Sequence, residues 1–562
     1  MTRFLCATGL HEHFPTRAIA AIIVSLLFLT VALSVYHPVV LRSGQYDDSY
    51  ITYRYAANLA RGRGLVFNSY EKVNSASSLL YTLLLAGFYK LGFTNLEFVG
   101  AAVGLLSGLV MASVLVLLVE RLCGSRSLAL AFSLPVCLCG SITGWAVSGM
   151  ETILYTALIV VFLWFYTVGQ TGPTAILLAA CLLCRPEGIL LLLAVLGAEI
   201  FASGGRPSRR FFAFLLVGSL VFIGQAVFNS LYYGEFFPHP VVLKKLAFYY
   251  WPGVGEKIRK VAEFLAKNFG IYLLLGGVYA VSLAAGAIAR PFASRRRAGH
   301  STGGSAVGRL RSAISPQAGT TEAGGPASVE LAIALFILLS FASFAVGPKS
   351  DQRRYVVHII PVLAVATGVC WKGIEVSRLF GRRNSAVLVI ALVVLWAQTL
   401  ANQNRTARSF LPETEAQNAR KALGKWIDQN VPLEDIVLSS DIGAIAYFAG
   451  RHDFVDAFGL TSRLPLLAAK GDSWKDFTDW LAREKPRWVA DTFDESAGRI
   501  RALAIIDNPA RFFRGLADNP EAAEVFSTRL KVQKVLDLPA SSRRFVLARL
   551  QWPDRPEQTR RQ

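Results

Sequence analysis

The sequence predicts a polytopic α-helical membrane protein with a small polar α/β domain at its C-terminal end. Of the 562 residues, 53% are hydrophobic and 17% are charged, whereas soluble domains are roughly 45–50% apolar and about 25% charged. The apolar residues gather in runs of about 15–25 residues between short polar loops, which is the pattern of membrane-spanning helices. These runs stop near residue 403, where the composition becomes that of a soluble domain.

Twelve apolar segments are candidate spans. They cover residues 18–41, 78–92, 98–120, 128–147, 153–168, 173–184, 189–202, 211–228, 269–289, 328–346, 356–371 and 385–402. The residues before the first run carry no cleavable signal pattern, so this run is expected to be a retained span.

Basic loops set the expected orientation. The Arg-rich stretches at 204–210, 289–300 and 378–383 are typical of the cytoplasmic side. With a cytoplasmic N-terminus, the loop 42–77 then lies outside, and so does everything after residue 403. Basic residues between apolar runs also account for the net charge of +20, so a nucleic-acid partner is not expected and the surroundings are membrane lipids.

Twelve full spans would return the C-terminus to the cytoplasm, which contradicts the basic loops. One segment is therefore expected to be a half-span or re-entrant, leaving about eleven spans. The segment 128–147 is the candidate. It is interrupted by Pro135, Gly140 and Gly144, and irregular backbone is tolerated at membrane depth where it lines a cavity. The Gly-, Ser-, Ala- and Arg-rich loop 290–327 is expected to be a flexible cytoplasmic insert.

Residues 403–562 are expected to form the extracytoplasmic α/β domain, and residues 1–402 the membrane domain. The stretch 421–460 predicts an amphipathic helix, a strand, a turn and a second strand, and "KPRWVADTF" at 485–493 predicts another strand. Asp441, which follows the first of these strands, is expected to cap the turn.

Charged and polar side chains recur beside the expected extracytoplasmic ends of the spans. They are Asp47, Asp48, Glu151, Arg185, Glu187, His239, Lys244, Lys245, Arg353, Arg354 and Tyr355. Charges at such depth are costly unless they are paired or functional. A carboxylate accepts the proton of an attacking hydroxyl, and Arg and Lys hold phosphate groups. The combination suits glycosyl transfer from a lipid phosphate.

Six motifs occur in an order that resembles the GT-C superfamily of membrane glycosyltransferases. They are "DDSYITYRYAANLARGRGLVFN", "SGMET", "CRPEG", "NSLYYGEFFPHPVVLKK", "RRYVVHIIPVLA" and "SSDIGAIAYFAG". Within that superfamily the pattern is most similar to the terminal β-(1→2) arabinofuranosyltransferase family of mycobacterial cell walls. The resemblance implies a GT-C fold, a polyprenyl-phosphate sugar donor used outside the cytoplasm, inversion at the anomeric carbon, and an acidic base in the first external loop.

The resemblance also implies residue roles. Asp47 or Asp48 is expected to be the catalytic base, and Tyr53 and Arg54, one helical turn on, to brace its loop. The donor-phosphate candidates are Arg353, Arg354, Lys244, Lys245 and His239, and the supporting residues are Glu151, Arg185, Glu187 and Tyr355. The stretch 73–82 departs from the family's pattern and is expected to shape the acceptor groove.

Two candidate groups have structural alternatives at a helix start. Asp47 or Asp48 would equally serve as the N-cap of a helix expected at 49–61. Glu151 would equally serve as an acid favoured by the helix macrodipole.

The other candidates are weighed against simple pairing or exposure. Arg185 and Glu187 are expected mainly to form an ion pair at the membrane boundary. Lys244 and Lys245 would also fit as interfacial residues whose charges reach the headgroups. Arg353 and its neighbour Arg354 are exceptions to the positive-inside rule, and an anionic ligand explains such an exception.

The sequence therefore predicts an inverting glycosyltransferase of the bacterial inner membrane. It would move a sugar, arabinofuranose or a similar pentose, from a polyprenyl phosphate to a cell-envelope glycan. No redox or nucleotide cofactor is expected, and a divalent metal is left open because no strong ligand set is visible. The alternatives are a transferase acting on protein or lipid A, and a lipid or sugar transporter. A transporter would show matching interrupted helices in two halves, and the sequence shows no such pairing.

Overall fold

The computed structural model describes most of the membrane helices and the centre of the C-terminal domain. The described residues are 14–36, 44–246, 326–346, 357–376, 416–462, 485–494, 499–507, 531–540 and 543–552, with isolated positions at 255–256, 258–259, 262–263, 397 and 481. The predicted spans at 269–289 and 385–402, and the predicted insert at 290–327, lie outside the described residues.

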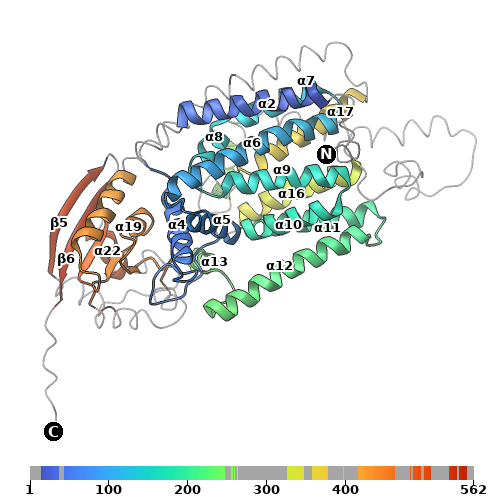
Figure 1. The fold of residues 1–562 in the computed structure, drawn as a ribbon. Coiled ribbons are helices and arrows are strands. Elements are labelled where there is room, and N and C mark those ends of the chain that lie inside the picture. The colour runs from blue at the N-terminus through green and yellow to red at the C-terminus, as the bar shows by residue number, and fades with distance from the viewer. Residues whose placement is uncertain are drawn as a thin grey trace, which may run out of the picture.

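Except for α4 and α13, which lie between them, the described helices before the C-terminal domain follow the predicted apolar segments. They are α2 (Phe14–Val31) with a π-helical turn η1 (Ala32–Tyr36), α4 (Asp47–Ala60), α5 (Leu79–Lys90), α6 (Leu96–Cys123), α7 (Arg126–Leu138), α8 (Gly140–Ala146), α9 (Thr152–Val168), α10 (Thr171–Cys184), α11 (Gly188–Ala202), α12 (Arg209–Tyr233), α13 (His239–Leu246), α16 (Pro326–Val346) and α17 (Ile359–Val376). In Figure 1 the long helices run side by side as one bundle.

The helix ends follow local signals in the sequence. The side chains of Asn95 and Ser208 accept hydrogen bonds from backbone amides in the first turns of α6 and α12, which satisfies donors that have no partner inside the helix. Helices α6, α9 and α12 end at Gly124, Gly169 and Gly234, each with the left-handed φ that glycine adopts without strain. The helix boundaries were therefore predictable to within a few residues.

Three helices are long and apolar enough to cross a membrane: the segment Ala18–Val35, α6 and α12. The pair α7 and α8 would make a fourth, although its two halves are bent by 55°. The interruption predicted in 128–147 is therefore confirmed, and Pro135 lies inside α7. The remaining helices of the described chain contribute apolar stretches of 10–17 residues, such as Ser328–Ser343 in α16 and Ile359–Val369 in α17, so the count of about eleven spans stays a prediction.

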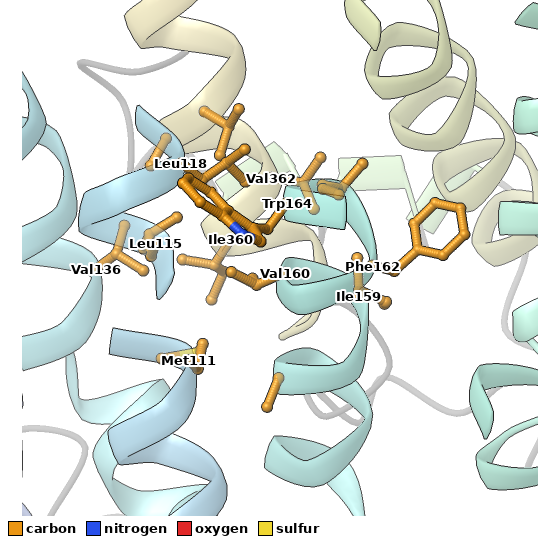
Figure 2. Close-up of a cluster of buried hydrophobic side chains, with 14 of the residues drawn as sticks. Met111, Leu115, Leu118, Val136, Ile159, Val160, Phe162, Trp164, Ile360 and Val362 are labelled. Carbon is orange, nitrogen blue, oxygen red and sulfur yellow. The ribbon is translucent and has the colours of Figure 1, made fainter. Parts of the chain in front are cut away.

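The interior of the bundle is a close-packed apolar core. Figure 2 shows side chains of α6, α7, α9 and α17 meeting there; Leu115, Val136, Val160, Ile360 and Val362 are almost completely buried. These helices are apolar on every side, as expected for helices surrounded by others or by lipid. By contrast, α12 lies at the edge of the bundle (Figure 1), and only 11% of its most apolar window is buried.

The C-terminal domain is built on a mixed sheet. Its elements are a helix over residues 416–430, β1 (Val437–Ser439), α19 (Ala444–Phe448), β2 (Phe454–Asp456), β3 (Trp488–Asp494), β4 (Arg499–Ile500), α22 (Arg501–Asp507), β5 (Lys531–Ala540) and β6 (Arg543–Gln551). The strand order is β2-β1-β3-β6-β5; β1 is parallel to β2 and β3, and β6 is antiparallel to β3 and β5. The predicted helix and the two strands after it are confirmed, and so is the strand predicted at 485–493; the predicted turn between the first two strands contains the short helix α19.

Successive residues of β1 point to opposite faces of the sheet, so this strand contributes to two separate apolar cores. Leu438 belongs to the core under α22, whereas Val437 belongs to a second core. That second core includes Leu423 of the 416–430 helix and two residues of α4, Ile51 and Tyr55. The sheet therefore packs on α4 through its second face, and α4 stands between the sheet and the bundle (Figure 1).

Candidate active site

The two aspartates form the first turn of α4. Tyr46 is the N-cap residue, and the helix begins at Asp47. Asp47 and Asp48 therefore occupy the first two helical positions, where the macrodipole favours negative charge. The alternative that one of them is the N-cap of a helix at 49–61 is wrong, because the helix starts two residues earlier than expected.

The start of α4 is joined to the loop that precedes α9. The backbone amide of Tyr46 donates to the Ser148 carbonyl at 3.1 Å. The hydroxyls of Tyr53 and Tyr81 both donate to the Gly149 carbonyl, at 3.3 and 2.8 Å. A Cβ at Gly149, whose φ is +79°, would lie 2.2 Å from the Tyr53 hydroxyl. The contact of Tyr53 with Gly149 is compatible with the expectation that Tyr53 braces the Asp47 loop, which stays a prediction. Gly149 belongs to the motif "SGMET".

Glu151, two residues after Gly149, forms a buried ionic cluster with the motif "CRPEG". The Arg185 guanidinium lies 2.7 Å from the Glu151 carboxylate and 3.3 Å from that of Glu187. Arg185 and Glu151 are both nearly fully buried, and Glu151 is the N-cap residue of α9. The predicted ion pair between Arg185 and Glu187 is confirmed, and Glu151 joins it as a second, closer carboxylate.

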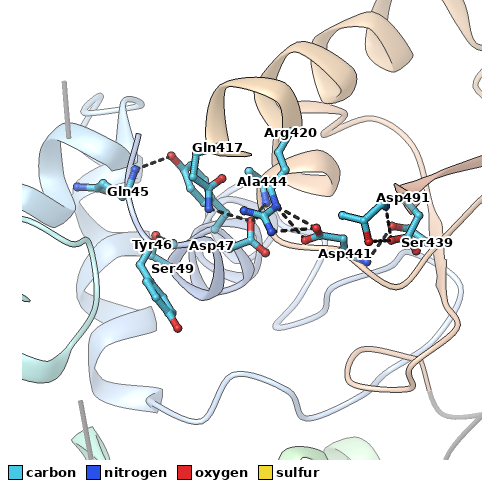
Figure 3. A network of polar contacts seen from close by, with 12 residues as sticks. Gln45, Tyr46, Asp47, Ser49, Gln417, Arg420, Ser439, Asp441, Ala444 and Asp491 are labelled. Atoms are coloured by element: carbon cyan, nitrogen blue, oxygen red, sulfur yellow. Dashed lines mark hydrogen bonds and ion pairs between the residues drawn. The ribbon is translucent and has the colours of Figure 1, made fainter. Parts of the chain in front are cut away.

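The Asp47 carboxylate is held by the C-terminal domain (Figure 3). Its Oδ1 accepts hydrogen bonds from the Ala444 amide at 2.9 Å and from Gln417 Nε2 at 3.3 Å, and it lies 3.6 Å from Arg420 Nε. A Cβ at Gly443 would lie 2.3 Å from Asp47 Oδ2, so only glycine lets the carboxylate approach α19 this closely. The Asp47 side chain still keeps 19% of its surface exposed.

Arg420 connects Asp47 to a second carboxylate. Its Nε and Nη2 atoms donate to the Asp441 carboxylate at 2.9–3.0 Å, in a two-pronged arrangement. The Asp441 amide donates to Ser439 Oγ at 3.1 Å. The expectation that Asp441 caps the turn stays a prediction; its carboxylate binds Arg420, and the α19 amide of Ala444 donates to Asp47.

Burial raises the pKa of Asp47 to about 7. The nearby Arg420 opposes this effect, while Asp441 adds to it, and the hydrogen bond from the Ala444 amide lowers the pKa slightly. The buried Asp491, whose carboxylate accepts from the Ser440 amide, has its pKa raised to about 6 by burial and by the charge of Asp441. Asp47 and Asp491 therefore bind a proton more readily near neutral pH than an exposed aspartate does.

Arg54, two turns further along α4 than Asp47, is a second connection between this helix and the C-terminal domain. The buried guanidinium donates to three backbone carbonyls: Phe67 at 2.8 Å, His452 at 2.5 Å, and Ala446. It also lies 4.6 Å from the centre of the Phe67 ring. Arg54 is expected to brace the loop of the base; its hydrogen bonds run to Phe67 in the segment after α4 and to the C-terminal domain, so the bracing role stays a prediction.

The stretch 73–82 meets several parts of the fold at once. The Tyr55 hydroxyl donates to the Val73 carbonyl at 2.6 Å, and the His239 amide donates to the Asn74 carbonyl at 2.9 Å. The Ser75 hydroxyl donates to a carbonyl of the C-terminal domain, that of Leu460. The expected role of this stretch at the acceptor groove stays a prediction, but its position between three parts of the fold is compatible with it.

The donor-phosphate candidates are only partly described. His239 is fully buried, with Nδ1 3.0 Å from the Glu235 carboxylate. Lys244 and Lys245 lie in α13, but the structure does not describe their side chains. Arg353, Arg354 and Tyr355 lie outside the described residues. Within the described ranges, no group of three or more His, Cys, Asp and Glu side chains is arranged to hold a metal ion.

Sequence reasoning missed Gln417 and Arg420. Both lie in the 416–430 helix, 370 or more positions after Asp47, and nothing near them in the sequence resembles a site. The motif "SSDIGAIAYFAG" was a partial signal, because it contains Asp441, which binds Arg420, and Gly443, which lies against the Asp47 carboxylate.

The bundle, α4 and the C-terminal domain together define a GT-C-like membrane glycosyltransferase fold. The chain is similar to ArnT from Cupriavidus metallidurans, as seen in a crystal structure with undecaprenyl phosphate bound: the TM-score is 0.52 and the identity 15%, over 93% of this chain and 97% of that one. The chain is thus a multi-pass membrane protein, and the predicted GT-C resemblance is confirmed at the level of the fold.

A relative by sequence is the terminal β-(1→2)-arabinofuranosyltransferase of Mycobacterium tuberculosis. It is 27% identical over 220 residues, which are 36% of this chain and 35% of that protein. The match therefore covers about a third of the relative's length. A family model described as "Domain of unknown function (DUF8728)" matches residues 406–542, the part of the chain that contains Arg420 and Asp441.

Proposed function

We propose that this protein is an inverting glycosyltransferase that moves a sugar from a polyprenyl-phosphate donor to a cell-envelope glycan on the extracytoplasmic face. The sugar is arabinofuranose or a similar pentose, and Asp47 is the general base. The C-terminal domain lies on the same extracytoplasmic face as Asp47.

The observation that carries the proposal is the environment of the Asp47 carboxylate. A general base works best when its pKa lies near the working pH, and burial raises the pKa of Asp47 to about 7. The hydrogen bond from the Ala444 amide fixes the carboxylate, while the exposed 19% of the side chain leaves room for an acceptor hydroxyl. Of the two adjacent aspartates, Asp47 therefore fits the role of base.

The proposed reaction is one displacement. Asp47 takes the proton of the acceptor hydroxyl, the hydroxyl oxygen attacks the anomeric carbon from one side, and the bond from that carbon to the phosphate oxygen breaks on the other side. The configuration is inverted, and the lipid phosphate leaves with the bonding electrons.

Cationic side chains would stabilise the leaving phosphate. We assign this role to Lys244, Lys245, Arg353 and Arg354, with His239 in support. Arg353 precedes His358 by five residues in the sequence. The ring of His358 lies 5.3 Å from that of Tyr155, and Arg185 lies 5.9 Å from the same tyrosine ring. His358, which follows the basic pair closely in the sequence, thus lies beside the tyrosine that Arg185 contacts.

The class of donor is supported by the shared fold. The ArnT crystal structure contains undecaprenyl phosphate, and a polyprenyl-phosphate sugar is the corresponding donor. The choice of arabinofuranose rests on the partial match to the mycobacterial arabinofuranosyltransferase.

The test is transfer from radiolabelled polyprenyl-phosphate arabinose in membranes from cells that express the protein. Asp47→Asn should lose about 10²–10⁴-fold in rate, the range for removal of a general base, at normal detergent-extracted yield. Asp48→Asn separates the two candidate bases and should keep most of the activity. Asp428→Asn, which alters a partly exposed carboxylate of the C-terminal domain, is the control.

The outcomes discriminate between the parts of the proposal. Full activity of Asp47→Asn would overturn the assignment of the base. Transfer from another lipid-linked sugar but not from the arabinose donor would overturn the pentose. No transfer by the wild type from any polyprenyl-phosphate sugar would overturn the function.

A further inference from the structure

We propose that the C-terminal domain completes the active site, with Arg420, itself oriented by Asp441, acting as the positioning residue for the Asp47 carboxylate. This inference rests on the proposed function, because it takes Asp47 to be the base. It adds a role for a domain whose matching family model carries no function.

Arg420 lies between two carboxylates that come from different parts of the chain. It is 3% exposed, its Nε is 3.6 Å from Asp47 Oδ1, and it binds Asp441 at 2.9–3.0 Å. A planar guanidinium held by two hydrogen bonds on one side has a fixed orientation. Asp441 therefore fixes the plane of Arg420, and Arg420 presents a fixed positive charge to Asp47.

The helix over residues 416–430 is suited to this task. Gln417 and Arg420 are three residues apart and so lie on one face, from which both contact Asp47. The next residue, Lys421, lies 2.6 Å from the Glu97 carboxylate at the start of α6. Because Leu423 on the same helix packs in the core shared with α4, the helix is held to the membrane domain by both ionic and apolar contacts.

The charges facing Asp47 come from three elements. Asp48 lies beside it on α4, Arg420 on the 416–430 helix, and Asp441 on the loop after β1; the hydroxyl of Tyr50, one turn further along α4, is also close. Arg420 stabilises the charged carboxylate, while Asp441 and Asp48 oppose it. Removing Arg420 and removing Asp441 should therefore shift the titration of Asp47 in opposite directions.

The experiment is the pH dependence of the sugar-transfer rate for the wild type and for Arg420→Gln, Asp441→Asn and Arg420→Lys. A base must be deprotonated, so the rate should rise with pH, with a wild-type midpoint near 7. An opposite charge at this distance commonly lowers a carboxyl pKa by about one unit or more. Arg420→Gln should therefore move the midpoint up by about one unit, and Asp441→Asn should move it down.

Arg420→Lys keeps the charge but loses the planar fork. Its midpoint should stay near that of the wild type while the maximal rate falls about tenfold or more, since a misplaced catalytic group is costly. The matched control is Arg451→Gln, which removes an exposed arginine of the same domain, paired with Asp428 at 3.1 Å. Its midpoint and maximal rate should be those of the wild type.

The inference would be overturned if Arg420→Gln and Asp441→Asn kept the wild-type midpoint, or moved it in the same direction, while Asp47→Asn was inactive. That result would leave the proposed function intact. If the wild type transferred no sugar from any polyprenyl-phosphate donor, the proposed function and this inference would both fail. If Asp47→Asn stayed active, the assignment of the base and this inference would fail. If Arg420→Gln does not fold, the other two variants still test the inference. An unshifted midpoint for Asp441→Asn contradicts it, and so does full activity of Arg420→Lys.

Discussion

Replacing Arg54 by glutamine should loosen the C-terminal domain from α4. The Arg54 guanidinium donates to the carbonyls of Phe67, Ala446 and His452 from a position that is 4% exposed. Burial lowers its pKa to about 10, so the side chain remains charged at neutral pH. Glutamine is shorter and uncharged, and it has too few donors to reach all three carbonyls.

The magnitude follows from these contacts. A hydrogen bond that involves a charged group contributes about 1.5–3 kcal/mol, and a buried carbonyl left without a partner costs about 1–3 kcal/mol. Because contacts within one network are not additive, the expected loss is about 3–4 kcal/mol in the free energy of local opening. Every 1.4 kcal/mol is a factor of ten, so opening should become about 10²–10³-fold more frequent.

Amide hydrogen exchange of the detergent-solubilised protein measures this opening directly. The reporters are the amides of Tyr447 and Ala449, which donate within and just after α19 at 3.1 and 3.0 Å. The matched control is Arg63→Gln: this exposed arginine reaches the same domain through a single 3.5 Å contact with the Gly450 carbonyl and should change exchange less than threefold. If Arg54→Gln also changed exchange less than threefold, Arg54 would not be what holds the two parts together.

Three further outcomes follow from the same geometry. Arg185→Gln leaves the buried Glu151 without its cation and should lower the free energy of unfolding in detergent by about 3–5 kcal/mol; a loss under 1 kcal/mol would contradict a buried ion pair. Gly443→Ala places a Cβ 2.3 Å from Asp47 Oδ2, so the carboxylate must move and sugar transfer should fall at least about tenfold, whereas Gly172→Ala, with open space around it, should have no effect. Wild-type transfer should be slow at pH 5 and rise through pH 7, because the raised pKa of Asp47 keeps the base protonated in acid; a rate that is flat from pH 5 to 8 would show that another group is the base.

Part of the site was predictable because its signals are local. Arg185 and Glu187 are two residues apart beside an apolar helix, and pairing is the cheapest way to keep such charges there; the structure pairs them at 3.3 Å. The break between α7 and α8 likewise follows from Pro135 and the glycines near it. In both cases the deciding residues lie within a few positions of one another.

Which of Asp47 and Asp48 contacts the C-terminal domain was not predictable. The two side chains are identical and adjacent in the sequence, so no local pattern separates them. Their environments differ because the C-terminal domain places the Ala444 amide 2.9 Å from Asp47 Oδ1, across 397 positions of the chain. The same packing brings Arg420 beside this carboxylate, although nothing around Arg420 in the sequence resembles a site.

The sequence by itself thus determined the membrane class, the apolar helices, the first three strands of the C-terminal domain and the ion pair of Arg185 with Glu187, because apolar periodicity, caps and the cost of isolated charges act over a few residues. Only the tertiary structure decided which aspartate the C-terminal domain holds, which arginine faces it, and why Gly443 is a glycine. Those features depend on the contact between α4 and a domain almost 400 residues later, and burial, which raises the pKa of Asp47, exists only once the two surfaces have met.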